Sequence, residues 1–147
     1  MPATSSPTAS FSNRTFGVEI EFLARGFSAS RLASILSEAG VPTVAESCNH
    51  RVRDHWKIVT DAALSYGGLA LVSPILRGTD GLRALALAAS ALVSAGCRVD
   101  RSCGIHVHVG AGDLSTPALC RLVLLADDAY SNRGVNYLVA PSRRSHS

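Results

Sequence analysis

Two carboxylates, Glu19 and Glu21, stand two residues apart in the segment 16–22. Apolar and polar residues alternate there with a period of two, which predicts a strand. The two side chains then project from the same face, about 6–7 Å apart along the chain. Like charges this close repel each other unless a cation lies between them, and carboxylate oxygens are the ligands that Mg²⁺ prefers. The pair indicates a metal site, and the alternative is a solvated outer face of a strand.

Two imidazoles, His106 and His108, follow the same pattern in the apolar segment 105–109. On a strand both project from one face, while the alternating apolar residues face the core; these are Ile105, Val107 and Val109. An imidazole pair can ligate a metal or donate hydrogen bonds to phosphate. Together with the carboxylates it suits a divalent cation bound to phosphates better than a closed structural site. Surface histidines and a zinc hydrolase are the alternatives, although no further zinc ligands follow at a diagnostic spacing.

Four other residues are weaker candidates for a site. Asp61 follows the predicted strand 56–60, where it can contact a substrate or cap a turn. Trp56, the only tryptophan, fits a pocket wall or the core. Arg143 and Arg144 can neutralise phosphate or form a solvated pair near the end of the sequence.

Alternating strands and helices must position these residues. Apolar periodicity predicts strands at 16–22, 56–60, 69–73 and 105–109, and helices capped by Ser28, by Thr79 or Asp80, and by Ser115. Strands with one polar face predict an α+β fold, in which a mostly antiparallel sheet has its helices on one face. Residues 1–14 are rich in Ser, Thr and Pro, so we expect a disordered tail followed by one domain over 15–147.

The composition excludes several classes of protein. A chain of 147 residues with 47% hydrophobic and 17% charged residues is not intrinsically disordered. The net charge of +3 comes from scattered basic residues, so we expect no nucleic-acid partner. The longest uncharged apolar stretch, 84–97, falls short of the roughly 20 residues that cross a membrane. Because the first residues contain no apolar signal segment, we expect a cytoplasmic protein with reduced cysteines.

Four ordered segments resemble the motifs of the amidoligase family, which is related to glutamate–cysteine ligase and glutamine synthetase. They are Phe16–Glu21, Trp56–Asp61, Leu71–Leu76 and Cys103–Val109, and Pro141–Arg144 resembles a later family segment. The resemblance implies a glutamine-synthetase-like ligase fold with ATP and Mg²⁺ on the concave face of the sheet. It also implies ATP-dependent joining of a carboxylate to an amine through an acyl phosphate. The partners would be small-molecule or peptide carboxylates and amines.

The resemblance also implies roles for particular residues. Glu19 and Glu21 would hold Mg²⁺, His106 would assist metal binding, and His108 would reach an ATP phosphate. These four are the candidate catalytic residues. The remaining candidates are Arg143 and Arg144 for the phosphates of ATP, and Asp61 and Trp56 for the substrate.

Two departures from the family pattern bear on activity. The family reads Glu-Leu-Val-Ser-Pro where this chain has Ala70 before Leu71, so one expected carboxylate is absent. Family chains also run longer, which predicts a truncated, partial ligase domain whose unfinished sheet edge favours self-association. We therefore predict an ATP-dependent ligase that is incomplete or weakly active. The alternative is a non-catalytic metal- or nucleotide-binding remnant or an interaction module.

Overall fold

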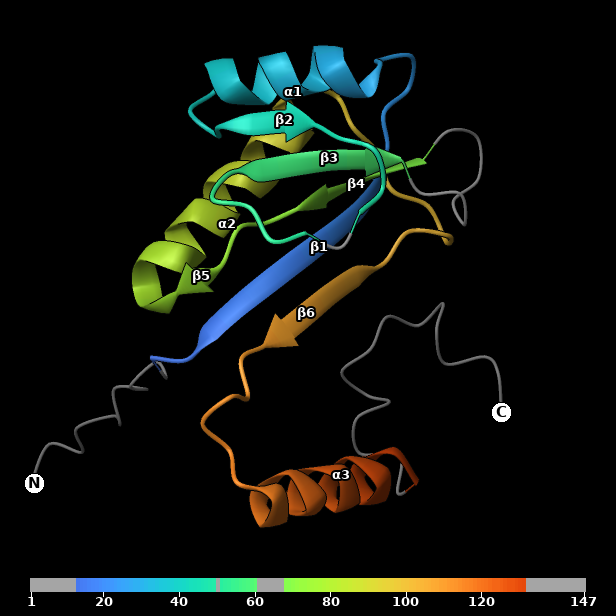
Figure 1. Cartoon of the computed structure of the whole chain (residues 1–147). Helices are drawn as coiled ribbons and strands as arrows, with labels where there is room; N and C mark the ends of the chain where they lie inside the picture. Colours follow the sequence, from blue (N-terminus) through green and yellow to red (C-terminus); the bar gives the residue numbers. More distant parts are fainter. Residues whose placement is uncertain (1–12, 50, 61–67, 132–147) are drawn as a thin grey trace, which may run out of the picture. The chain divides into compact units, whose positions relative to one another are not determined.

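Among the described residues, six strands between Thr15 and Val109 form one sheet (Figure 1). The computed structural model describes residues 13–49, 51–60 and 68–131. The strands run in the order β2-β3-β4-β1-β5, and β6 pairs with β1. They are β1 (Thr15–Leu23), β2 (Thr43–Ala45), β3 (Trp56–Thr60), β4 (Gly68–Val72), β5 (Leu76–Arg77) and β6 (Ile105–Val109). Among the described strands, only β2 and β3 pair in parallel, so the predicted α+β class with a mostly antiparallel sheet is confirmed.

Strand β1 is paired along both edges. Glu19 pairs with Val72 of β4 on one edge and with His106 of β6 on the other. The alternation of the sequence predicted this strand, and the structure extends it by one residue at each end. Because a strand that is hydrogen-bonded along both edges can move little, β1 holds the candidate carboxylates at fixed positions.

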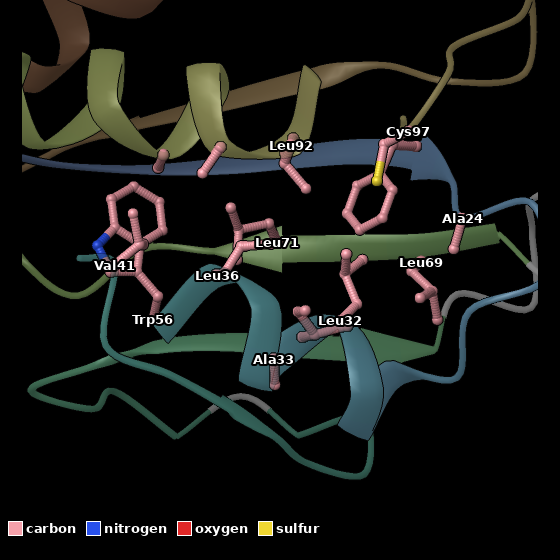
Figure 2. Close-up of a cluster of buried hydrophobic side chains, with 14 of the residues drawn as sticks. Ala24, Leu32, Ala33, Leu36, Val41, Trp56, Leu69, Leu71, Leu92 and Cys97 are labelled. Atoms are coloured by element: carbon pink, nitrogen blue, oxygen red, sulfur yellow. The ribbon is translucent and has the colours of Figure 1, made fainter. Parts of the chain in front are cut away.

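Helices α1 (Ala29–Glu38) and α2 (Gly78–Ser94) pack against one face of the sheet and bury the core. Figure 2 shows Leu36 of α1, Leu71 of β4 and Leu92 of α2 meeting there. Burying each such side chain stabilises the fold by about 1.5–3 kcal/mol. Helix α1 begins after Ser28, as predicted, and the Ser28 Oγ accepts a hydrogen bond from the Arg31 N–H at 3.2 Å.

The predicted N-cap of α2 is wrong. The helix begins at Gly78, and its N-cap is Arg77, which makes no capping hydrogen bond with its side chain. Neither Thr79 nor Asp80 is the cap, because β5 pairs with β1 and leads directly into the helix. Gly78 makes this change of direction with a φ of +54°, a conformation that favours glycine.

The predicted burial of the apolar side of β6 is also wrong. Ile105, Val107 and Val109 are 67%, 61% and 60% exposed. Strand β6 pairs with the edge of β1 that faces away from β4. Helices α1 and α2 pack over β3 and β4, on the other side of β1. In the described part of residues 1–110, nothing covers this side of β6. The alternation thus predicted the strand correctly but not its burial.

The chain divides into two units, 1–110 and 111–147. The second contains helix α3 (Thr116–Ser131), the helix predicted to follow Ser115. Among the described helices, none is long and apolar enough to span a membrane. The residues that form the site described below all belong to the first unit.

Candidate functional site

The face of the sheet opposite α1 and α2, which we call the site face, carries the predicted polar residues. Paired residues on neighbouring strands point to the same side of a sheet. The register pairs Glu19 with His106, and Gly17 with His108. Because residues two apart on a strand also share a side, Glu21 lies on the same face. Both carboxylates and both imidazoles therefore share one surface, opposite the face that α1 and α2 cover.

His106 lies between the two carboxylates. Its Nδ1 is 3.6 Å from Glu19 Oε2, and its Nε2 is 3.6 Å from Glu21 Oε1. The Glu21 side chain is 10% exposed, the Glu19 side chain 28% and the His106 side chain 53%. The three groups form a line across β1 and β6 that is open to solvent at the imidazole.

Glu21 also has a structural role. Its Oε2 accepts a hydrogen bond of 2.5 Å from the backbone N–H of Gly104, and its own N–H donates to the Gly104 carbonyl at 3.0 Å. Strand β6 begins at the next residue, so Glu21 fixes the entry of the chain into β6. Charge-assisted bonds of this kind contribute about 1.5–3 kcal/mol. Glu19 makes no such bond to the described backbone, which leaves its carboxylate freer for a ligand.

A cavity of about 500 Å³ opens beside Glu19 on the site face. His108 from β6 and Arg51 from the segment before β3 also line it, together with apolar residues such as Val59 and Val72. Gly17 lies in its floor, where a Cβ would meet only Ser73 Oγ, at 3.7 Å. A larger side chain at position 17 would project from the site face and take up part of this volume. The volume is in the range of small-molecule sites.

Residues 46–49 and 51–53, which we call the wall segment, contribute Cys48, Asn49, Arg51 and Val52 to one wall of this cavity. Glu46 accepts three hydrogen bonds from Arg53, at 2.8, 3.0 and 3.2 Å, and one from Asn49, at 2.9 Å. These hydrogen bonds lower the pKa of Glu46 to about 2, and those from Arg53 have the largest effect. The ion pair between Arg53 and Glu46 therefore ties the wall segment together.

Lys57 anchors the wall segment to the sheet. It lies on β3 in the same row as Val72 and Glu19, and it is only 4% exposed. Its Nζ donates to the carbonyls of Asn49 and Arg51, both at 2.9 Å, and to Asn49 Oδ1 at 3.1 Å. The sequence analysis missed Lys57 and Arg51. The available signal was one lysine inside an otherwise apolar strand, since a buried ammonium group must have acceptors.

The other candidates do not join this cluster. Trp56 is 4% exposed and belongs to the core on the opposite face (Figure 2), as the register of β3 requires. Its position there favours the core role over a substrate contact. Asp61, Arg143 and Arg144 lie outside the described residues.

The candidate metal ligands are close together but do not converge. Among the described residues, no group of three or more His, Cys, Asp or Glu side chains is arranged to hold a metal ion. The reason is visible in the geometry of His106, whose two nitrogens face different carboxylates. Glu19 and Glu21 remain a pair of hard oxygen donors on an open face, next to Ala70 where the family has a third carboxylate.

Comparison with known proteins agrees with the sequence motifs. A family model described as "Putative amidoligase enzyme" matches residues 12–126. The matched span contains Glu19, Glu21, His106 and His108 together with the wall of the cavity. No curated protein and no solved structure gives a significant match. Because the family model covers well over half of the sequence, the chain belongs to the amidoligase family.

Proposed function

We propose that the site face belongs to an ATP-dependent carboxylate–amine ligase that forms an amide bond through an acyl phosphate. The observation that carries this proposal is the line of Glu19, His106 and Glu21 beside a cavity that Glu19 shares with His108. Membership of the amidoligase family supports the same reaction class. A reaction that consumes ATP also favours the cytoplasm as its location.

The reaction has two steps. A carboxylate oxygen of the acid attacks the γ-phosphorus of ATP and releases ADP. The amine nitrogen then attacks the acyl carbon, phosphate leaves, and the amine loses a proton. Phosphoryl transfer depends mainly on positioning and on cations around the developing negative charge. His108, on the cavity wall, would donate to a phosphate oxygen, and His106 would accept the proton of the amine.

The donor set fits a magnesium ion that arrives with a nucleotide. Mg²⁺ is usually bound by one or two carboxylates, with phosphate oxygens and water completing its shell. Glu19 and Glu21 would supply the carboxylates, and His106 lies beside them. When bound, the ion would neutralise phosphate charge.

The test is phosphate release from ATP with glutamate and an amine present. Glu19→Gln keeps the shape of the side chain and removes its charge, and we expect it to lower turnover about 100-fold. Glu38→Gln, at the exposed end of α1, is the matched control and should behave as the wild type. We prefer Glu19 to Glu21 for this test because Glu21 also holds Gly104. Equal turnover in the wild type and Glu19→Gln would contradict the proposal.

A non-catalytic nucleotide-binding remnant is the second candidate, and Ala70 favours it. Ala70 is fully buried on β4 directly across from Glu21, so no carboxylate from this position reaches the site face. ATP binding without phosphate release, under any acid and amine tried, would identify this second function. A zinc hydrolase has no such support, because no third ligand accompanies His106 and His108 among the described residues.

Self-association through a sheet edge stays a prediction. Among the described strands, β6 pairs only with β1, so its other edge presents unpaired backbone groups. Sedimentation velocity over a range of protein concentrations would detect such association.

A further inference from the structure

We propose that Arg51 is the residue that recognises an oxyanion, a carboxylate or phosphate group of the ligand, in the cavity of the site face. This inference rests on the ligase or nucleotide-binding function proposed above and adds a residue to which no role has been assigned. The carboxylate would belong to the acid substrate, and the phosphate would belong to the nucleotide.

The backbone of Arg51 is fixed on both sides. Its N–H donates to Asn49 Oδ1 at 3.1 Å, and its carbonyl accepts from Lys57 Nζ at 2.9 Å. Lys57 is buried on β3, so the anchoring passes directly to the sheet. A fixed backbone limits the space that the exposed guanidinium can reach, so no backbone ordering is needed when a ligand binds.

The guanidinium of Arg51 has no acidic partner among the described residues. The nearest acid in the wall segment, Glu46, is engaged by Arg53, Asn49 and His55. Glu46 thus neutralises the charge of Arg53, and no described carboxylate neutralises the charge of Arg51. Arg51 is exposed, and it lines the cavity together with His108.

The cavity itself suits an anionic ligand with an apolar part. Its described ionisable lining consists of Arg51, His108 and Glu19, with Cys48 as the remaining titratable group. Valine side chains supply most of the apolar wall near β3 and β4. A guanidinium binds carboxylate and phosphate through two parallel hydrogen bonds, which a lysine cannot reproduce.

The experiment is calorimetric titration of the full chain with two probes, inorganic tripolyphosphate and glutarate, at an ionic strength of about 0.15 M. We expect the wild type to bind at least one probe and Arg51→Gln to bind it about tenfold or more weakly. Arg83→Gln is the matched control, because Arg83 pairs with Asp80 on the exposed side of α2, away from the cavity lining. A loss confined to tripolyphosphate assigns Arg51 to the nucleotide, and a loss confined to glutarate assigns it to the acid substrate.

Three outcomes would overturn the proposal: wild type that binds neither probe, Arg51→Gln that binds as the wild type does, or an equal loss in Arg83→Gln. Circular dichroism of each variant establishes that the fold is retained. The ligase function and the role of Arg51 can be refuted independently of each other. Arg51-dependent binding without amide formation refutes the reaction alone, whereas amide formation with unchanged binding in Arg51→Gln refutes the role of Arg51 alone.

Discussion

Replacing Ala70 by glutamate restores the residue of the family motif and tests the geometry of the site face. Ala70 pairs with Glu21 of β1 and with Val59 of β3, and it is fully buried. Side chains directly opposite each other on antiparallel strands have Cβ atoms about 4.5–5.5 Å apart. A glutamate at position 70 would therefore place a second carboxylate beside Glu21, without a cation between them.

The size of the effect follows from that separation. Two like charges about 5 Å apart at an effective dielectric constant of about 20 repel by about 3 kcal/mol. Ala70→Gln adds nearly the same volume without the charge, so both variants carry an overpacking cost of about 1–3 kcal/mol. The difference in unfolding free energy between Ala70→Glu and Ala70→Gln isolates the repulsion.

The assay is urea denaturation of both variants, first with a chelator at about pH 7. We expect Ala70→Glu to be less stable than Ala70→Gln by about 3 kcal/mol. The repulsion requires both carboxylates to be ionised, so the difference should disappear at about pH 4 and below, where carboxyl groups bind protons. Added Mg²⁺ or Mn²⁺ should also reduce it, because a cation between the carboxylates offsets their repulsion.

One result would refute this reasoning. If the two variants have equal stability at every pH and with every metal, position 70 and Glu21 do not face each other. The arrangement of the site face would then be wrong. If the repulsion is present but no metal relieves it, the face is arranged as described and does not bind metal.

Three further substitutions test the surroundings of the site. Lys57→Met keeps the apolar stem but leaves the carbonyls of Asn49 and Arg51 without the Lys57 donor. We therefore expect the free energy of unfolding, measured by urea denaturation, to fall by about 1–3 kcal/mol, and the wall segment to be held less firmly. Hydrogen bonds from Arg53, and to a smaller extent from Asn49 and His55, lower the pKa of Glu46 from 4.5 to about 2. This carboxylate therefore stabilises the folded state above about pH 4.5, and the contribution is lost as the pH falls towards 2. The stability of the wild type should therefore fall more steeply over this range than that of Glu46→Gln; parallel curves would contradict the ion pair. Gly81→Ala would bring a Cβ to 2.9 Å from the Leu76 Cβ, so we expect a lower melting temperature despite the better helix propensity of alanine, and an increase would show that α2 can move.

The sequence was sufficient for features that depend on residues close together in the chain. Alternation predicted β1 and β6, because successive side chains of a strand point to opposite sides whatever its neighbours are. It follows that Glu19 and Glu21 share a side. The capping serine predicted the start of α1 because a cap acts on a backbone N–H three residues away.

Pairing between distant segments decided what lies next to each carboxylate. No local sequence pattern predicts that His106 is opposite Glu19, or that Ala70 is opposite Glu21, because these pairings join residues far apart in the chain. The N-cap of α2 was mispredicted for the same reason, because the pairing of β5 with β1 sets the point at which the chain turns.

Burial likewise depends on what packs against a face. The alternation in β6 marks Ile105, Val107 and Val109 as one apolar side, yet they are exposed because neither α1 nor α2 reaches that strand. Conversely, Lys57 looks like a surface residue, but the wall segment folds over it and supplies its acceptors. The sequence by itself thus determined which side chains share a side of each strand, through a repeat of two residues. Only the tertiary structure decided which strands and loops meet across that side, because long-range hydrogen bonds and packing set the register.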